Sequence, residues 1–170
     1  KSFGEKQVLK DVAFSVPGGQ ALGLLGRNGA GKTTMIRIIM GVFDADGGSV
    51  LLDGKPIDRS RVKIGYLPEE RGLYPKKIIS RQLAYFGALK GMTSSETKEA
   101  TEKLLGRLEM SEYLNKKLEV LSKGNQQKIQ LAVALLNDPD ILILDEPFSG
   151  LDPVNAMLLK DIVMEMIEKG

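Results

Sequence analysis

A glycine-rich octapeptide early in the chain has the residue types and spacing to hold phosphate groups. It runs Gly26-Arg27-Asn28-Gly29-Ala30-Gly31-Lys32-Thr33 and matches the P-loop pattern G-x-x-x-x-G-K-[ST]. The glycines allow the backbone to point several N–H groups at one phosphate, and a helix that begins there adds partial positive charge. Lys32 would bring a full charge to the β- and γ-phosphates, and the Thr33 hydroxyl can ligate Mg²⁺. The octapeptide therefore predicts a site for a nucleotide and its magnesium ion.

Two carboxylates follow a short apolar run later in the chain. Ile141–Leu144 is predicted to be a buried strand, and Asp145 and Glu146 come directly after it. An acid at such a strand end can hold Mg²⁺ through water, and the next acid can act as general base toward an attacking water. Alone the pattern is weak, because buried strands often end in aspartate. Together with the P-loop it predicts Asp145 as a metal residue and Glu146 as a catalytic residue.

The elements that must position these residues can be outlined from apolar spacing and turn signals. We expect strands within Val8–Val16, which stops at Pro17-Gly18-Gly19, and at Ala21–Leu25, Ser49–Leu52, Ile64–Leu67 and Ile141–Leu144. We expect helices at Lys32–Met40, Ser80–Leu89, Ser94–Met110, Lys123–Leu136 and Pro153–Lys169. Strands alternate with helices around a mostly helical insertion, which favours an α/β fold with a mostly parallel sheet.

Composition limits the class of protein further. The 170 residues fit one domain, and the absence of cysteine excludes disulfides and thiolate metal sites. The chain has no histidine, and its formal net charge of +2 does not call for nucleic acid as a partner. It carries no uncharged apolar run long enough for a membrane span and no signal-peptide pattern. If the protein works at a membrane, another chain must supply the spans.

Two further motifs indicate a family. Leu121-Ser122-Lys123-Gly124-Asn125-Gln126-Gln127-Lys128 resembles the LSGGQ signature of ATP-binding cassette (ABC) proteins, and Phe148-Ser149-Gly150-Leu151-Asp152-Pro153 resembles the D-loop of that family. Lys123 replaces the first glycine of the signature, and Asn125 stands at its glutamine. With the P-loop, three motifs match in order, and the resemblance covers essentially the whole chain. Ser122 and the Gly124 N–H would open a helix whose N-terminus is a second phosphate-binding end.

The resemblance implies the P-loop NTPase type of fold, with an N-terminal antiparallel β part and an inserted helical subdomain. We expect one nucleotide-binding domain over residues 1–170, with a core at about 1–71 and 121–170 and the helical subdomain at about 72–120. The resemblance also implies a head-to-tail dimer of two identical chains, in which each signature caps the γ-phosphate bound by the other subunit. It implies Lys32 and Glu146 as catalytic residues. It places the nucleotide on Arg27, Asn28, Gly29, Ala30, Gly31, Lys32, Thr33, Thr34, Ser122, Gly124 and Asn125.

Two weaker site residues follow from the same resemblance. Phe3 lies 23 residues before Gly26, where the family places an aromatic residue that stacks on adenine. Packing in the core is the alternative role for Phe3. Glu69 stands where the family has the glutamine of its Q-loop, and we expect it to be a third metal residue beside Thr33 and Asp145. A plain solvent-exposed glutamate is the alternative there.

The family also places a histidine after the D-loop to hold the γ-phosphate. This sequence reaches Gly170 without a histidine. We expect a chain truncated before that point, clipped also near Lys1. The alternative is a domain that never had the histidine and hydrolyses ATP slowly.

The resemblance points most strongly to the ATPase subunit of a membrane transporter. The stretch from Ile64 to Pro75 is similar to that of bacterial ABC-2-type export ATPase subunits, which often work with a separate membrane subunit. Residues Arg71–Lys77 and the helical block would contact that subunit at the cytoplasmic face of the cell membrane. The alternative is a soluble ABC ATPase that acts on ribosomes or another cytosolic machine. Only 88 residues separate Lys32 from Leu121, too few for the long coiled coil of the DNA-repair members.

Overall fold

The computed structural model describes residues 1–70, 72–149 and 151–169. The chain forms two compact units, one of residues 1–61 with the end of the chain from Lys160, and one of residues 62–159. Each unit contains a different set of the predicted site residues. The first contains the P-loop, and the second contains the Asp145-Glu146 strand and the signature segment.

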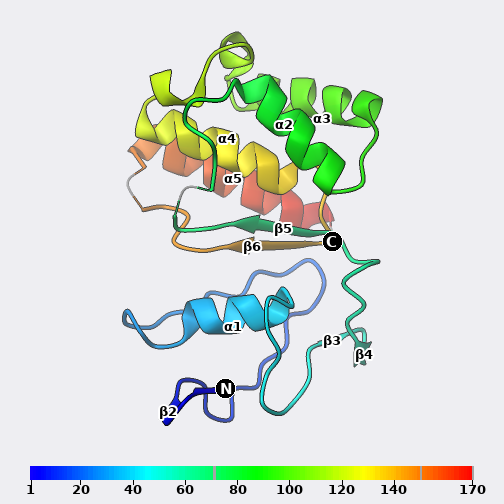
Figure 1. The fold of residues 1–170 in the computed structure, drawn as a ribbon, viewed down its shortest axis with the longest axis vertical. Helices are drawn as coiled ribbons and strands as arrows, with labels where there is room; N and C mark the ends of the chain where they lie inside the picture. Colours follow the sequence, from blue (N-terminus) through cyan, green and yellow to red (C-terminus); the bar gives the residue numbers. More distant parts are fainter. Residues whose placement is uncertain (71, 150, 170) are drawn as a thin grey trace. The chain divides into compact units, whose positions relative to one another are not determined.

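A parallel strand pair lies at the base of the second unit. Strands β5 (Ile64–Leu67) and β6 (Ile141–Leu144) run in register, with Ile64 opposite Ile141 and Leu67 opposite Leu144. Helix α4 (Lys123–Leu135) packs across β5 (Figure 1). The packing is close because Gly65 has no side chain: a Cβ there would lie 2.6 Å from the carbonyl oxygen of Ala134. Both strands end at the same edge, so the residues that follow them gather there.

The helical block packs against α4. Helices α2 (Ile79–Leu89) and α3 (Ser94–Arg107) pack against each other and against α4, followed by short 3₁₀ turns η1 (Ser111–Tyr113) and η2 (Leu118–Val120). Gly87 allows α2 and α3 to approach, because a Cβ there would collide with the Thr97 side chain. Their core is apolar and fully buried, with Leu67, Ile79, Leu83, Leu105, Leu108, Met110, Leu118 and Ile129.

Among its described residues, the first unit contains two small hairpins, the helix that follows the P-loop and the end of the last helix. Strands β1 (Ser2–Phe3) and β2 (Lys6–Gln7) pair antiparallel, as do β3 (Leu51–Leu52) and β4 (Lys55–Pro56). Helix α1 (Lys32–Ile39) follows the P-loop. Helix α5 (Pro153–Lys169) starts in the second unit and runs into the end of the chain.

Most of the expected elements are present, and the α/β class with an N-terminal antiparallel part and a helical block is confirmed. Strands β5 and β6 and helix α5 have the predicted bounds. Helix α3 ends at Arg107 rather than at Met110, because Glu109 adopts a left-handed φ of 57° that stops the helix. The strand expected at Ser49–Leu52 is shortened to β3.

The strands predicted at Val8–Val16 and Ala21–Leu25 are wrong for this structure. Both segments are described, and neither carries a strand ladder. Val8 and Leu9 instead both donate their N–H to the Lys1 carbonyl, at 2.8 and 3.1 Å. The Leu25 side chain is 97% exposed. An apolar run becomes a strand only where a neighbouring strand supplies hydrogen bonds and a surface to cover, and these segments pair with none.

Candidate nucleotide-binding site

The P-loop is exposed from Gly26 to Ala30, and hydrogen bonds close the loop on itself. The Lys32 ammonium donates to the Gly26 carbonyl at 2.7 Å, and the Ala30 N–H donates to the Arg27 carbonyl at 3.1 Å. Gly29 and Gly31 adopt left-handed φ angles of 81° and 94°. A side chain would strain the backbone at both positions. The loop thus places the Lys32 charge at the start of α1.

The N-terminus of α1 is suited to an anion. Gly31 is the N-cap residue, no side chain caps the helix there, and the first turn carries no acidic residue. Thr33 and Thr34 stand in that first turn, half-buried. Gly31 also contacts the unit's interior, because a Cβ would come within 2.7 Å of the Leu9 side chain. The helix dipole and the backbone N–H groups therefore face the loop, and the first turn itself contributes no carboxylate.

Phe3 lies beside a second aromatic ring. Its ring meets that of Phe43 edge to face at 5.6 Å, and the Lys1 ammonium lies over both rings. Phe3 stays 49% exposed, so half of its surface is available for another ring. The sequence prediction did not include Phe43, since nothing in its local spacing separates it from an ordinary loop residue.

Asp145 and Glu146, which follow β6, differ in exposure and in backbone conformation. Asp145 is 6% exposed, its N–H donates to the Leu67 carbonyl at 2.9 Å, and the Tyr66 hydroxyl lies 3.5 Å from its Oδ2. Glu146 is exposed and takes a left-handed φ of 50°. This conformation is uncommon for a residue with a side chain, and it also occurs at Glu109, where a helix ends. The strand end thus offers one buried carboxylate and one exposed carboxylate in succession.

Glu69 lies just beyond the end of β5, at the same edge as Asp145, and is exposed. The backbone around it is fixed by Gln130 of α4, which is 6% exposed. The Gln130 side chain donates to the carbonyls of Pro68 and Glu70, at 3.3 and 3.1 Å. Gln130 was missed from the sequence. The sequence signal that could have found Gln130 is a glutamine at a position of α4 where helical spacing predicts a buried apolar side chain.

The signature segment opens α4. Ser122 is the N-cap residue, and its hydroxyl accepts a hydrogen bond from the Asn125 N–H at 3.3 Å. Ser122 and Lys123 are exposed, and the first turn of α4 has no acidic residue. Like the N-terminus of α1, this helix start has no acidic residue in its first turn. It differs from α1 in being exposed and capped by a side chain, that of Ser122.

The D-loop segment opens α5 next to it. The Asp152 carboxylate accepts the N–H groups of Val154 and Asn155, each at 3.0 Å, and the Asn155 side-chain amide at 2.5 Å. These bonds, the Asn155 backbone N–H first, hold the pKa of Asp152 below its usual range. Asp152 is thus the N-cap of α5, with Pro153 at the first helical position. Gly150 lies outside the described residues.

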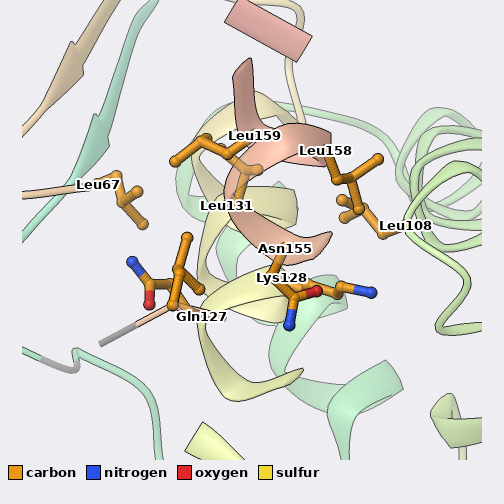
Figure 2. Close-up of a pocket in the computed structure, with 9 residues that line it drawn as sticks. Leu67, Leu108, Gln127, Lys128, Leu131, Asn155, Leu158 and Leu159 are labelled. Carbon is orange, nitrogen blue, oxygen red and sulfur yellow. The ribbon is translucent and has the colours of Figure 1, made fainter. Parts of the chain in front are cut away.

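A small cavity lies between α4 and the start of α5. It measures about 20 Å³, room for about one water molecule, and its lining includes Gln127, Lys128, Leu131 and Asn155 (Figure 2). A nucleotide does not fit there, so this hollow is a packing gap beside the signature rather than the nucleotide site.

The family follows from comparison with known proteins. A family model described as "ABC transporter" matches residues 9–149. The chain belongs to this ABC family. It is 49% identical to the ABC transporter ATP-binding protein YhaQ of Bacillus subtilis over 100% of the chain and 57% of that protein. It is 36% identical to the Nod factor export ATP-binding protein I of Paraburkholderia xenovorans, over 100% of the chain and 57% of that protein.

The ABC fold is supported by a solved structure as well. The ATP-binding subunit of an ABC transporter superposes with a TM-score of 0.86 at 30% identity, over 99% of this chain and 72% of the other. The P-loop NTPase fold expected from the sequence is thereby confirmed. The chain spans a little over half the length of the curated ABC relatives described above.

Within this ABC chain, the predicted site residues are divided between the two compact units. Asp145, Glu146, Glu69 and the signature residues belong to one compact unit, and the P-loop and Phe3 belong to the other. The nucleotide and metal roles of these residues stay predictions. No helix in the described part of the chain is long and apolar enough to cross a membrane.

Proposed function

We propose that this chain binds Mg-ATP and hydrolyses it as the ATP-binding subunit of an ABC transporter. The observation that carries the proposal is the presence of two helix N-termini fit for phosphate in one chain, at α1 and α4. One follows the P-loop and the other is the family's signature. ABC ATPase domains bind nucleotide, and this chain is a member of the family.

Each predicted residue has a role in this proposal. The P-loop backbone and Lys32 hold the phosphates, with Arg27, Asn28, Gly29, Ala30, Gly31, Thr33 and Thr34 around them. Phe3 stacks on the adenine. Glu146, exposed at the end of β6, accepts the proton of the attacking water as general base. Lys32 stabilises the charge that develops on the transferred phosphoryl group.

The residues present also fit Mg²⁺. Thr33 offers a hydroxyl oxygen, and Asp145 and Glu69 offer carboxylate oxygens, the donor type that Mg²⁺ prefers. Among residues 1–70, 72–149 and 151–169, no three Asp, Glu, His or Cys side chains form a complete metal cage. Mg²⁺ in nucleotide sites is commonly held by one or two protein groups together with phosphates and water. When bound, the ion neutralises phosphate charge and orients the γ-phosphoryl group.

Two copies of the chain would complete two sites. Ser122, Gly124 and Asn125 at the start of α4 would cap the γ-phosphate held by the P-loop of a second subunit, in a head-to-tail dimer. ATP binding closes such a dimer, and hydrolysis reopens it. The one-domain layout, with a core at about 1–71 and 121–170 and a helical subdomain at about 72–120, belongs to this proposal.

A separate membrane-spanning subunit is the proposed partner, with this chain at the cytoplasmic face of the cell membrane. The helical block offers it an exposed aromatic surface. Tyr74 and Tyr85 are 51% and 49% exposed, and their rings meet edge to face at 6.4 Å. Arg71, also predicted to be at this contact, lies outside the described residues. The likeness to a Nod factor export protein favours the export class.

Co-purification tests the partner. The full-length protein is expressed with its neighbouring genes, and the membranes are solubilised and purified through a tag on this subunit. We expect a multi-span membrane protein to co-elute, with ATPase activity that is lost in Glu146→Gln. A Tyr85→Asp variant should lose the membrane protein, whereas Lys55→Asp, exposed in the other unit, should retain it. Recovery with ribosomes or alone in the soluble fraction would favour the soluble ABC ATPase instead.

A further inference from the structure

We propose that Asn155 is a positioning residue that holds the start of the signature helix α4 against the D-loop, and that Gly124 is glycine because the Asn155 amide occupies the space of its Cβ. The proposal rests on the proposed function, since it concerns the geometry of the signature and the D-loop at an ATP site. It adds a residue outside both motifs and a packing reason for the signature glycine.

Asn155 is held rigidly by Asp152. Its backbone N–H donates to Asp152 Oδ1 at 3.0 Å, and its side-chain Nδ2 donates to Oδ2 of the same carboxylate at 2.5 Å. A side chain bonded at both its backbone and its tip has little freedom to rotate away. The position of the Asn155 amide is therefore set by the N-cap of α5.

Gly124 meets that amide directly. A Cβ built on Gly124 would lie 2.9 Å from Asn155 Nδ2 and 3.6 Å from Asp152 Oδ2. The end of a flexible side chain would ordinarily swing aside at small cost. Here the swing would break the bond between Asn155 and Asp152, because the atom in the way is the donor of that bond.

A second contact holds the same loop to α4. The Gln127 side chain, one turn after Gly124, donates to the Pro147 carbonyl at 2.7 Å. Pro147 and Asn155 bracket the D-loop segment, so α4 touches it at both ends. Gln127 and Asn155, one residue from each contact, both line the cavity of about 20 Å³ (Figure 2). A shift of the signature helix when it grips phosphate would therefore move the D-loop with it.

A double-mutant cycle in the full-length subunit tests the contact. The variants are Asn155→Ala, Gly124→Ala and the two together, with Gly18→Ala as control, because a Cβ at Gly18 meets nothing within 4 Å. The first readout needs no ATP: the pKa of the Asp152 carboxyl, followed by NMR. The second is kcat and KM for ATP hydrolysis.

We expect Asn155→Ala and Gly124→Ala each to raise the pKa of Asp152, since each removes the Nδ2 bond. Each should lower kcat about tenfold, the effect of one lost hydrogen bond, with a much smaller change in KM because the P-loop is untouched. The double variant should be no worse than Asn155→Ala alone, because the clash is gone. If Gly124→Ala does not fold, the added Asn155→Ala should restore folding.

Additive losses in the double variant would overturn the proposal, as would a Gly124→Ala protein with an unchanged pKa at Asp152. A double variant that fails to fold where Asn155→Ala folds would overturn it too. If the wild-type subunit hydrolyses no ATP, the proposed function fails, and the NMR cycle still decides whether Asn155 holds Gly124 and Asp152 together.

Discussion

At the scale of single residues, the site combines groups whose conformations are unusual for their type. Glu146 follows the buried Asp145 with a left-handed φ of 50°, and Gly31 has a φ of 94° at the start of α1. Such conformations cost about 1–3 kcal/mol for a residue with a side chain. Glu146 bears that cost, whereas glycine at position 31 avoids it. The backbone conformation at Glu146 and Gly31 therefore contributes to the geometry of the candidate site, together with the side-chain type.

Substituting Gly31 with alanine tests this for the P-loop. The new Cβ would be forced into the left-handed region and would lie 2.7 Å from the Leu9 side chain. We expect Gly31→Ala to lower the free energy of unfolding by about 1–3 kcal/mol and to weaken nucleotide binding at least tenfold. Urea unfolding and calorimetric titration with ATP measure the two effects.

Gly47→Ala is the matched control, because position 47 has open space and no left-handed φ. It should leave both quantities close to the wild-type values. A Gly31→Ala protein that binds ATP as tightly as the Gly47→Ala protein would contradict this account of the loop.

At the scale of elements, helix α1 is fixed at its C-terminal end, opposite the proposed phosphate site. The Arg59 guanidinium donates from Nε to the Ile39 carbonyl and from Nη2 to the Ile38 carbonyl, each at 2.9 Å. These carbonyls are among the last of α1, where the regular i+4 donors of the helix interior are missing. The Ile38 carbonyl also accepts the Gly41 N–H at 3.0 Å. Gly41 leaves room for the arginine, since a Cβ there would lie 2.6 Å from Arg59 Cδ. Arg59 also complements the negative end of the helix dipole.

Removing the Arg59 side chain should loosen α1 selectively. We expect Arg59→Ala to lower the free energy of unfolding by about 1–2 kcal/mol and to speed amide hydrogen exchange in α1. Arg61→Ala is the control, because the Arg61–Asp58 pair is exposed and such pairs contribute little. Equal exchange rates in α1 for the two variants would show that Arg59 does not cap the helix.

The capping box of α3 predicts a pH dependence. The Glu96 carboxylate accepts the N–H of Thr93 at 2.7 Å, while the Thr93 hydroxyl accepts the Glu96 N–H at 3.2 Å. The Thr93 backbone bond, with its side-chain bond, holds the pKa of Glu96 below its usual range. A lowered folded-state pKa means that this stabilisation is complete above the ordinary pKa of glutamate and is lost as the pH falls through the lowered value.

Denaturant unfolding of Glu96→Gln and the wild type over a pH series checks this. The two proteins should differ most near neutral pH and converge as the solution becomes acid enough to protonate Glu96. Glu99→Gln, exposed on the same helix outside the capping box, should follow the wild-type curve. A Glu96→Gln deficit that stays constant down to acid pH would show that the carboxylate charge contributes nothing to the cap.

The elements that the sequence predicted well are those with strong local signals. Ile64–Leu67 and Ile141–Leu144 are apolar runs bounded by polar residues, and α5 begins at a proline after an aspartate cap. Ala21–Leu25 has the same apolar character and forms no strand, because strand formation depends on a neighbour that local pattern does not reveal. The contacts of Phe43, Gln130 and Asn155 were missed because each joins two different segments of the chain. A local pattern does not reveal which segments meet.

At the scale of the whole molecule, one chain carries both halves of the proposed ATP site. The P-loop with α1 is one half, and the signature at the start of α4 is the other. In the proposed dimer each half meets its counterpart on another subunit. Nucleotide binding and dimer formation should therefore be coupled, and hydrolysis should depend on Glu146.

ATP-dependent dimerisation measures this claim most directly. The wild-type, Glu146→Gln and Lys32→Ala forms of the full-length subunit are compared by analytical ultracentrifugation and by phosphate release, with and without Mg-ATP. We predict that Glu146→Gln keeps ATP binding, becomes a dimer with Mg-ATP, and hydrolyses it about 10²- to 10⁴-fold more slowly. Lys32→Ala should lose both binding and the dimer. A Glu146→Gln protein that hydrolyses ATP at the wild-type rate, or that stays monomeric while saturated with ATP, would contradict the account.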